Sequence, residues 1–309
     1  MADTNPISQS ALPLRIVSLL ARLAPNEGYT RSALEGVTFM RSNRALARTP
    51  ALYEPSIVVV AQGRKRGFHN GETYVYDAQH YLVLATPLPF EIETEASIDT
   101  PMLGIALRID IALIAELALA INKAQLPLTK LARVMFSTPL DSRLSDAVLR
   151  LLEALSSPIE SQLLAPAILR EVMYLVLSSE QAETLRAALA QDGKFLRIAK
   201  ALRRIHEQYD KRLNVGMLAT EACMSIPAFH IHFKGVTASS PIQYIKAMRL
   251  HQARLLMIRS GLSAATASVQ VGYESASQFN REFKRLFGRS PVEEAHHLKE
   301  VLSISPAAG

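Results

Sequence analysis

Two near-copies of one short segment lie fifty positions apart in the C-terminal third of this 309-residue chain. A repeat of this kind indicates a repeated supersecondary unit. In each copy two Phe residues are four positions apart, which is one helical turn, so each copy predicts a helix with a Phe-x-x-x-Phe stripe facing a core. The shared positions are Ser225/Ser275, Phe229/Phe279, Phe233/Phe283, Lys234/Lys284, Ser240/Ser290 and Pro241/Pro291.

Each copy is bounded by residues that begin helices. The Ser at its start is a favourable N-cap, and the Ser-Pro at its end caps the next helix with Pro at the first position. The same signals divide this part of the chain into helices expected at 195–208, 215–222, 227–237, 241–259, 264–270, 277–287 and 291–302. The expected caps are Asn214, Ser225, Ser240, Ser263, Ser275 and Ser290.

The segments of about 215–237 and 264–287 each match a helix-turn-helix, whose second helix enters a DNA major groove. The expected helix between them, at 241–259, has about 19 residues and spans roughly 28 Å at ~1.5 Å per residue. This length approaches the ~34 Å of one DNA turn. The spacing therefore predicts two reader helices that enter successive major grooves on one face of a duplex.

The second reader helix is expected to turn Phe279, Phe283 and Leu286 inward. Arg281 can pair bidentately with guanine, and an amide side chain can pair with adenine. The base-reading candidates of this helix are Ala276, Ser277, Gln278, Asn280 and Arg281. The candidates for phosphate contacts, which position DNA without specifying its sequence, are Ser275, Lys284, Arg285 and Arg289.

The first reader helix is poorer in hydrogen-bonding groups. Its base-reading candidates are Pro227, Ala228, His230 and Ile231, with Lys234 as the phosphate contact. Ile231 occupies the position that Arg281 holds in the second copy. We therefore expect one strong reader and one weaker reader, with DNA shape and methyl contacts taking a larger share at the weaker one.

The positive charge of the chain is concentrated around the repeat. Residues 194–300 carry 17 Lys and Arg against 8 Asp and Glu, a net charge of +9, whereas the rest of the chain carries −3. A basic part beside a near-neutral part favours nucleic acid as the partner of the basic part. A solvated charged face is the alternative interpretation.

Short β-rich runs separated by turn residues occupy residues 37–110. They predict a small antiparallel barrel or sandwich, able to hold one small ligand, with Asn70-Gly71 as a hairpin turn. The strands are expected at 37–40, 57–61, 74–76, 81–85, 90–94 and 103–109. Candidate pocket residues are Tyr53, Tyr74, Tyr76, His80 and Arg108, with packing and surface positions as the alternative.

Helical patterns surround this region, at 12–24, 111–121, 142–155, 165–177 and 181–190. Two interpretations of one leucine row stay open: a seam with a second subunit, or core packing within one chain. The row consists of Leu144, Leu151, Leu152 and Leu155. Gln191-Asp192-Gly193 is the best boundary, which gives domains 1–193 and 194–309. The expected fold class is α+β, with a helix-flanked β-barrel before an all-α domain.

Several function classes are disfavoured. A single cysteine excludes an internal disulfide and a multi-cysteine zinc site, and Cys223 is expected to be a small buried side chain in a helix rather than a thiol sensor. The barrel region holds only His69 and His80, so no metal is expected, and no catalytic pattern or cofactor motif stands out. An apolar run of ~18 residues and a secretory signal are both lacking, so a cytoplasmic, non-enzymatic protein is expected.

The C-terminal part, from about Phe195 to Val301, resembles the AraC/XylS family of bacterial transcription regulators. Its most specific segments are 267–275 (ASVQVGYES), 279–291 (FNREFKRLFGRSP) and Tyr244…Arg249-Leu250…Ala253-Arg254-Leu255-Leu256. Segments 52–56 (LYEPS) and 62–65 (QGRK) are similar to the cupin-like sensor domain of one branch of that family. The resemblance implies a cytoplasmic dimer that binds promoter DNA and responds to a small molecule, with RNA polymerase as a further candidate partner.

Two positions depart from the family pattern. Ala238 stands where the family usually has Gly, and Ile231 replaces a residue that is commonly basic or polar. They keep one alternative open, a ligand- or partner-binding protein with a weakened DNA-binding module. An enzyme fused to such a module, for example a methyl-accepting repair protein, would need a reactive cysteine and usually a zinc cluster of cysteines, which one cysteine within the helix-turn-helix does not supply.

Overall fold

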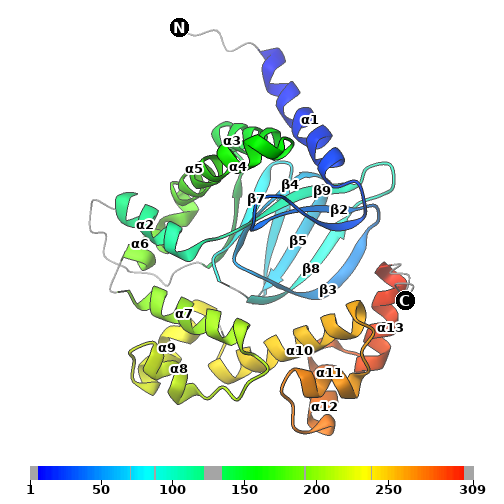
Figure 1. The fold of residues 1–309 in the computed structure, drawn as a ribbon, viewed down its shortest axis with the longest axis vertical. Coiled ribbons are helices and arrows are strands. Elements are labelled where there is room, and N and C mark those ends of the chain that lie inside the picture. Colours follow the sequence, from blue (N-terminus) through cyan, green and yellow to red (C-terminus); the bar gives the residue numbers. More distant parts are fainter. Residues whose placement is uncertain are drawn as a thin grey trace. The chain divides into compact units, whose positions relative to one another are not determined.

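The computed structural model describes residues 6–69, 71–86, 88–121, 134–190, 193–237 and 239–302. The chain divides into two compact units, with the main boundary between Leu196 and Arg197. The first unit contains one curled antiparallel sheet with helices, and the second contains helices (Figure 1). The expected α+β class is confirmed. Ala238, with its departure from the family pattern, and the proposed boundary residues Gln191 and Asp192 lie outside the described residues.

The sheet has ten strands in the order β1-β2-β9-β4-β7-β6-β5-β8-β3, with β10 beside β7. The strands are β1 (Gly28–Arg31), β2 (Val37–Ser42), β3 (Leu46–Tyr53), β4 (Ser56–Gln62), β5 (Arg64–His69), β6 (Glu72–Asp77), β7 (His80–Leu84), β8 (Leu88–Glu95), β9 (Met102–Arg108) and β10 (Met135–Pro139). All six predicted strands are present. β5 and β6 pair from His69 and Glu72, so the predicted hairpin has a two-residue loop, although Asn70 itself lies outside the described residues.

Four strands were not predicted: β1, β3, β5 and β10. β1 lies at one end of the sheet and β3 at the other, where one side of a strand needs no partner. The segment of β5, Arg64–His69, begins with three cationic residues and lacks the β-branched composition by which strands are predicted. Pairing with β6 and β8, rather than local propensity, makes it a strand.

Alternation along β4 separates the two faces of the sheet. Val58 and Val60 belong to the cluster inside the curl, while Ile57 and Val59 point to the other face, where Val59 shares a small pocket with Ile16 of α1. Helix α1 (Pro6–Leu23) packs on β4 and β9 (Figure 1). Because both faces are covered, β4 reads as a continuous apolar run.

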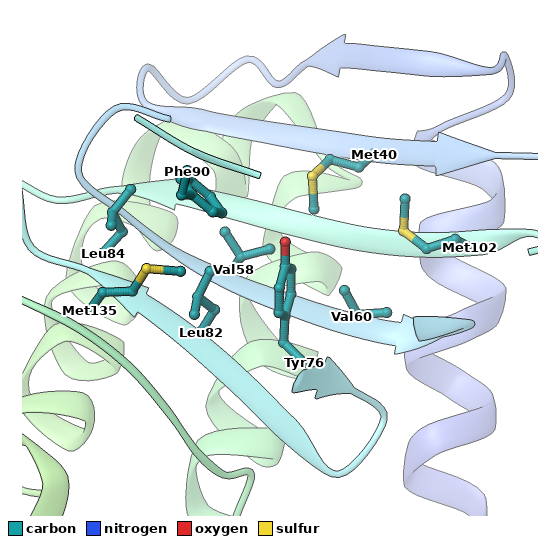
Figure 2. Close-up of a cluster of buried hydrophobic side chains, with 9 residues drawn as sticks. All are labelled: Met40, Val58, Val60, Tyr76, Leu82, Leu84, Phe90, Met102 and Met135. Carbon is teal, nitrogen blue, oxygen red and sulfur yellow. The ribbon is translucent and has the colours of Figure 1, made fainter. Parts of the chain in front are cut away.

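The inside of the curl is filled by side chains from seven strands. Tyr76 extends from β6 among three methionines that come from β2, β9 and β10 (Figure 2). The cluster consists of Met40, Val58, Val60, Tyr76, Leu82, Leu84, Phe90, Met102 and Met135, and each of these residues is at most 5% exposed. It forms the core of the first unit on the side away from α1.

The remaining helices agree with the sequence pattern, except for the short helix α4, which begins at Pro158 and was not predicted. They are α2 (Ile111–Ile121), α3 (Ser142–Leu155), α4 (Pro158–Leu163), α5 (Ala165–Leu177), η1 (Glu180–Ala182), α6 (Glu183–Ala190), α7 (Lys194–Glu207), α8 (Val215–Glu221), α9 (Ile226–Thr237), α10 (Pro241–Arg259), α11 (Ala264–Gln270), α12 (Ala276–Phe287) and α13 (Pro291–Leu302). Among the residues described, no helix is long and apolar enough to cross a membrane.

The leucine row on α3 is part of the core of the first unit. Leu144, Leu151, Leu152 and Leu155 are all at most 8% exposed, and α3 packs against α1 and α5. Core packing is therefore the correct one of the two interpretations that the sequence left open. These leucines are not available as an exposed seam for a second subunit.

Cys223 corrects one sequence expectation. It is exposed and lies in the turn between α8 and α9, rather than buried in a helix. Its φ is 50°, the single positive value at a non-glycine position in the described chain. The equivalent turn between α11 and α12 has Gly272 with φ 83°. The first turn therefore holds an L-residue in the left-handed conformation that glycine adopts without steric cost.

We expect Cys223→Gly to raise the free energy of unfolding by about 0.5–1 kcal/mol, since relief of left-handed strain outweighs the extra freedom of glycine in the unfolded chain. Urea unfolding followed by far-UV circular dichroism measures the change. Cys223→Ser is the control, because it removes the thiol but keeps the backbone constraint. A Gly variant no more stable than the Ser variant contradicts the strain.

Candidate nucleic-acid interface and barrel interior

The second unit contains two helix-turn-helix pairs, α8–α9 and α11–α12, with α10 between them (Figure 1). The observed helices begin and end within one residue of their predicted bounds. Each of the six predicted caps accepts a hydrogen bond from the backbone N–H three residues later. These bonds satisfy otherwise unpaired N–H groups and set the start of each reader helix.

The repeated Phe pairs form equivalent scaffolds. The ring centroids of Phe229 and Phe233 are 5.4 Å apart, as are those of Phe279 and Phe283, and all four side chains are at most 1% exposed. Leu286 was expected in this stripe but is 36% exposed. Phe287 lies in the core instead, because it continues the i, i+4 row of Phe279 and Phe283. Its ring centroid is 4.4 Å from that of Phe283.

The outer face of α12 is polar and open. Opposite the Phe stripe, exposed side chains on or just before the helix come from Ser275, Ala276, Ser277, Asn280, Arg281, Lys284 and Arg285. The face combines an amide and a guanidinium in its middle with cationic side chains toward its C-terminal end. This arrangement suits base contacts at the centre of the helix and phosphate contacts at its end.

Gln278 is placed differently from the other candidates. It is half-buried, and its Nε2 donates a hydrogen bond to Glu282 Oε1 at 3.1 Å. Glu282 also accepts from Lys246 Nζ on α10 at 2.6 Å and from the Tyr273 hydroxyl at 2.7 Å. Gln278 therefore helps to anchor α12 to α10.

The Glu282 carboxylate is the centre of this anchor. Burial alone would raise its pKa, but hydrogen bonds from Lys246, Tyr273 and Gln278 outweigh burial and lower the pKa below the usual value. The carboxylate is thus ionised at neutral pH. Its contribution to stability is present above the ordinary Glu pKa and is lost as the pH falls through the lowered value.

The first reader helix, α9, offers a more apolar surface. Pro227, Ile231 and Lys234 are exposed, with Ile231 70% exposed, while Ala228 and His230 are half-buried. The one strongly exposed side chain in the middle of the helix is thus aliphatic. The inequality of the two readers that the sequence predicts is visible in these exposures, while the DNA roles themselves stay predictions.

Arg249 of α10 joins the loop before the first motif to the turn of the second motif. Its Nε donates to the Tyr209 carbonyl at 2.7 Å, its Nη2 to the Lys211 carbonyl at 2.7 Å, and its Nη1 to the Gly272 carbonyl at 3.0 Å. The first two carbonyls precede α8, and the third lies in the α11–α12 turn. The planar guanidinium therefore fixes the second turn against the loop before the first motif.

Arg289, a predicted phosphate contact, lies beside a buried ion pair. Arg254 and Glu294 are 8% and 3% exposed and are 2.6 Å apart, which ties α10 to α13. Arg289 is half-exposed and approaches the same Glu294 at 3.4 Å. Part of its guanidinium is therefore directed toward α13, and the rest faces solvent.

The structure brings three of the five predicted pocket residues together and leaves the other two apart. Tyr76 lies in the interior cluster, Tyr53 packs on that cluster with its ring edge-on to Phe90, and Tyr74 is half-buried at its edge. His80 pairs with Asp77, and the exposed Arg108 pairs with Glu35. The last two residues lie outside the interior cluster.

Sequence reasoning missed Lys65, which is 3% exposed. On β5 it faces Tyr76 of β6 and Thr94 of β8, and its Nζ donates to Thr94 Oγ1 at 3.0 Å. Burial lowers its pKa to about 8. The only sequence signal was period-2 alternation in Arg64-Lys65-Arg66, which puts the middle residue on the opposite face from its neighbours.

Two family models match this chain. The model of the AraC-type transcriptional regulator N-terminus covers residues 33–184, and a helix-turn-helix domain model covers residues 218–295. The chain belongs to the AraC/XylS family of transcriptional regulators. The second match contains both reader helices, and the first contains most of the sheet and the helices α2–α5.

Curated transcriptional regulators are similar to part of this chain. The HTH-type transcriptional regulator AlkR of Acinetobacter baylyi is 34% identical over 94 residues, which is 30% of this chain and 31% of that protein. The HTH-type transcriptional activator RhaS of Pectobacterium carotovorum is 25% identical over 92 residues, 30% and 33% of the two chains. The match thus spans about a third of the length of these relatives.

Solved structures with a similar fold cover more of the chain. ToxT from Vibrio cholerae with an unsaturated fatty acid bound is 14% identical and covers 87% of this chain and 97% of its own, with a TM-score of 0.54. The apo structure of a ToxT variant from the same organism is 12% identical and covers 86% of this chain and 99% of its own, with the same TM-score of 0.54. At this identity the likeness concerns the fold.

Proposed function

We propose that this protein is a sequence-specific DNA-binding transcription regulator in which α12 is the main reader and α9 the weaker one. The observation that carries the proposal is the exposed row Ser277, Asn280 and Arg281 on a helix whose opposite face is locked by Phe279 and Phe283. A rigid helix with a free polar face is the device by which helix-turn-helix proteins read a major groove.

The linker geometry supports two contacts on one duplex. Helix α10 has 19 residues and therefore a length of about 28 Å at ~1.5 Å per residue. Glu282 and Arg249 fasten α10 to the second motif. Reader helices held at its two ends suit major grooves one DNA turn apart, roughly 34 Å.

We further propose that the interior of the sheet binds a small-molecule effector and that the protein acts in the cytoplasm as a homodimer, with RNA polymerase as a further partner. Supporting this, polar groups lie within an apolar interior at Lys65, Thr94 and Tyr76, and ToxT, which has a similar fold, was solved with a fatty acid. Light scattering that gives the mass of one chain would contradict the dimer.

The test of DNA binding is a titration of the full chain against genomic fragments selected for binding, at several salt concentrations. Because Lys and Arg contacts release counterions, the affinity should fall about a hundredfold between ~50 and ~200 mM salt. Specific fragments should bind at least about a thousandfold more tightly than random DNA. Affinity independent of salt and sequence would instead support the partner-binding alternative.

We expect Arg281→Ala to weaken binding to the selected site by about 1–3 kcal/mol and to relax the choice at one base pair. The reason is the exposed position of Arg281 at the centre of the better reader helix. Competition binding with single-base variants of the site measures both effects. His230→Ala should cost less, because His230 is half-buried on the weaker helix.

Arg143→Ala is the matched control, since it removes the same charge from an exposed position in the first unit. It should leave the affinity for both kinds of DNA unchanged. If Arg281→Ala weakens binding to the selected site and to random DNA equally, Arg281 is a phosphate contact and not a base reader. A His230→Ala loss as large as that of Arg281→Ala would overturn the ranking of the two motifs.

A further inference from the structure

The interior of the curled sheet contains a cation that the protein itself hardly neutralises. Lys65 is 3% exposed, and its described polar contact is one neutral hydroxyl, that of Thr94. Burial, and no neighbouring carboxylate, is the cause of its lowered pKa of about 8, so the amine is still mostly protonated at neutral pH. A buried charge without a counter-charge is costly, and such groups are usually paired.

Two further polar groups share this interior. The hydroxyls of Tyr53 and Tyr76 are buried, and neither makes a hydrogen bond of normal geometry, although they lie close enough to influence each other. Tyr76 is the cross-strand neighbour of Lys65, so both side chains are on the same face of the sheet. One ammonium and two buried tyrosine hydroxyls therefore lie in the same apolar interior.

The side chains around Lys65 and Tyr76 indicate that the rest of the ligand is apolar. Tyr76 lies among Met40, Met102 and Met135, which come from three different strands (Figure 2). Methionine side chains are flexible and repack at low cost, so this wall can move aside for an apolar body. Gly67, on the same strand as Lys65, lets Met135 and Phe90 pack close to the backbone, since a Cβ there would lie 3.0 Å from Met135 Cε and 3.2 Å from the Phe90 ring.

We propose that the effector is an apolar carboxylic acid whose carboxylate pairs with Lys65 and accepts from the Tyr76 hydroxyl, with Tyr53 beside it. A single negative charge matches the single ammonium. A phosphate dianion would leave a surplus charge buried in an apolar site. This inference rests on the proposed effector-responsive function only where it links acid binding to DNA binding. Acid binding itself is measured without DNA.

The experiment titrates the full chain by calorimetry with three acids and their matched neutral amides: octanoate and octanamide, phenylacetate and phenylacetamide, benzoate and benzamide. We expect at least one acid to bind at least about tenfold more tightly than its amide, as a charge-assisted hydrogen bond requires. If no acid binds better than its amide, the proposal is wrong.

Two variants locate the site. Lys65→Met should weaken the acid at least about twentyfold and leave amide binding within about threefold, because only the charge pair is lost. Tyr76→Phe keeps the ring and should weaken the acid by about threefold to tenfold. Acid binding that survives both changes would overturn the assignment. Lys65→Met should unfold at the same urea concentration as the wild type or at a higher one, since it removes a buried charge. A structural role for Lys65 predicts that the variant unfolds at a lower urea concentration than the wild type.

The link to regulation is measured separately. The preferred acid should change the affinity for the selected DNA in the wild type and not in Lys65→Met. Acid binding without any effect on DNA would leave the ligand class intact and contradict the effector role. DNA binding without any acid binding would contradict the ligand class and leave the DNA-binding proposal intact.

Discussion

A Gly272→Ala protein is expected to lose about 3 kcal/mol of local stability in the second helix-turn-helix, because alanine meets two separate penalties there. Gly272 has φ 83°, a conformation that costs an L-residue about 1–2 kcal/mol. A Cβ would also lie 2.6 Å from the carbonyl oxygen of Asp210. That oxygen is backbone, so the turn and the loop before α8 must separate. Arg249, which bonds to both segments, would lose its geometry.

Gly288→Ala is the matched control for this substitution. Gly288 caps α12 with φ 79°, but a Cβ there meets nothing within 4 Å. It should therefore cost only the conformational part, about 1 kcal/mol. Hydrogen exchange of peptides from α11 and α12 in the full chain measures the local stability of both variants. Equal losses in the two variants would show that the close approach to Asp210 has no energetic weight.

Arg249→Ala is expected to destabilise the second unit by about 2–3 kcal/mol and to weaken specific DNA binding at least tenfold. Two of the carbonyls that it bonds lie in the loop before the first motif and one lies in the second motif, and water replaces the guanidinium at a half-buried site only in part. Without it the second turn is no longer fixed against residues 209–211. The spacing of the readers then varies, and binding costs additional ordering.

Two substitutions test whether stability depends on the three hydrogen bonds of the Arg249 guanidinium rather than on its charge. Arg249→Lys keeps the charge but has one nitrogen, so it should recover little of the lost stability. Arg212→Ala breaks a nearby but fully exposed pair with Glu274 and should change the stability very little. Hydrogen exchange and competition binding apply to all three proteins. Wild-type behaviour of Arg249→Lys would show that charge alone, rather than the carbonyl clamp, is required.

Local signals predicted the helical unit well. The caps at Asn214, Ser240 and Ser263 and the Phe stripes depend on residues within one turn of each other, so the sequence contains them directly. One local prediction was wrong at the end of α12, where Leu286 and Phe287 are both apolar. The i, i+4 row of Phe279 and Phe283 continues to Phe287, which lies in the core in place of Leu286.

The errors at the candidate sites come from long-range partners. From the sequence alone Gln278 is a candidate reader, but in the fold Glu282 holds its amide, together with Lys246 from another helix. Lys65 has the sequence surroundings of a basic surface strand, but β6 and β8 enclose it. The sequence shows the residue type at Gln278 and at Lys65, but the role of each residue depends on contacts between segments far apart in the chain.

The central claim is that two unequal reader helices contact one face of DNA about a turn apart, and methylation interference tests it most directly. The selected site is methylated at guanine N7, the major-groove atom that arginine reads, and the bound and free fractions are compared. We predict interference in two clusters about 10 base pairs apart, with the stronger cluster weakened selectively by Arg281→Ala. A single cluster, or equal weakening of both clusters by Arg281→Ala, would contradict this account.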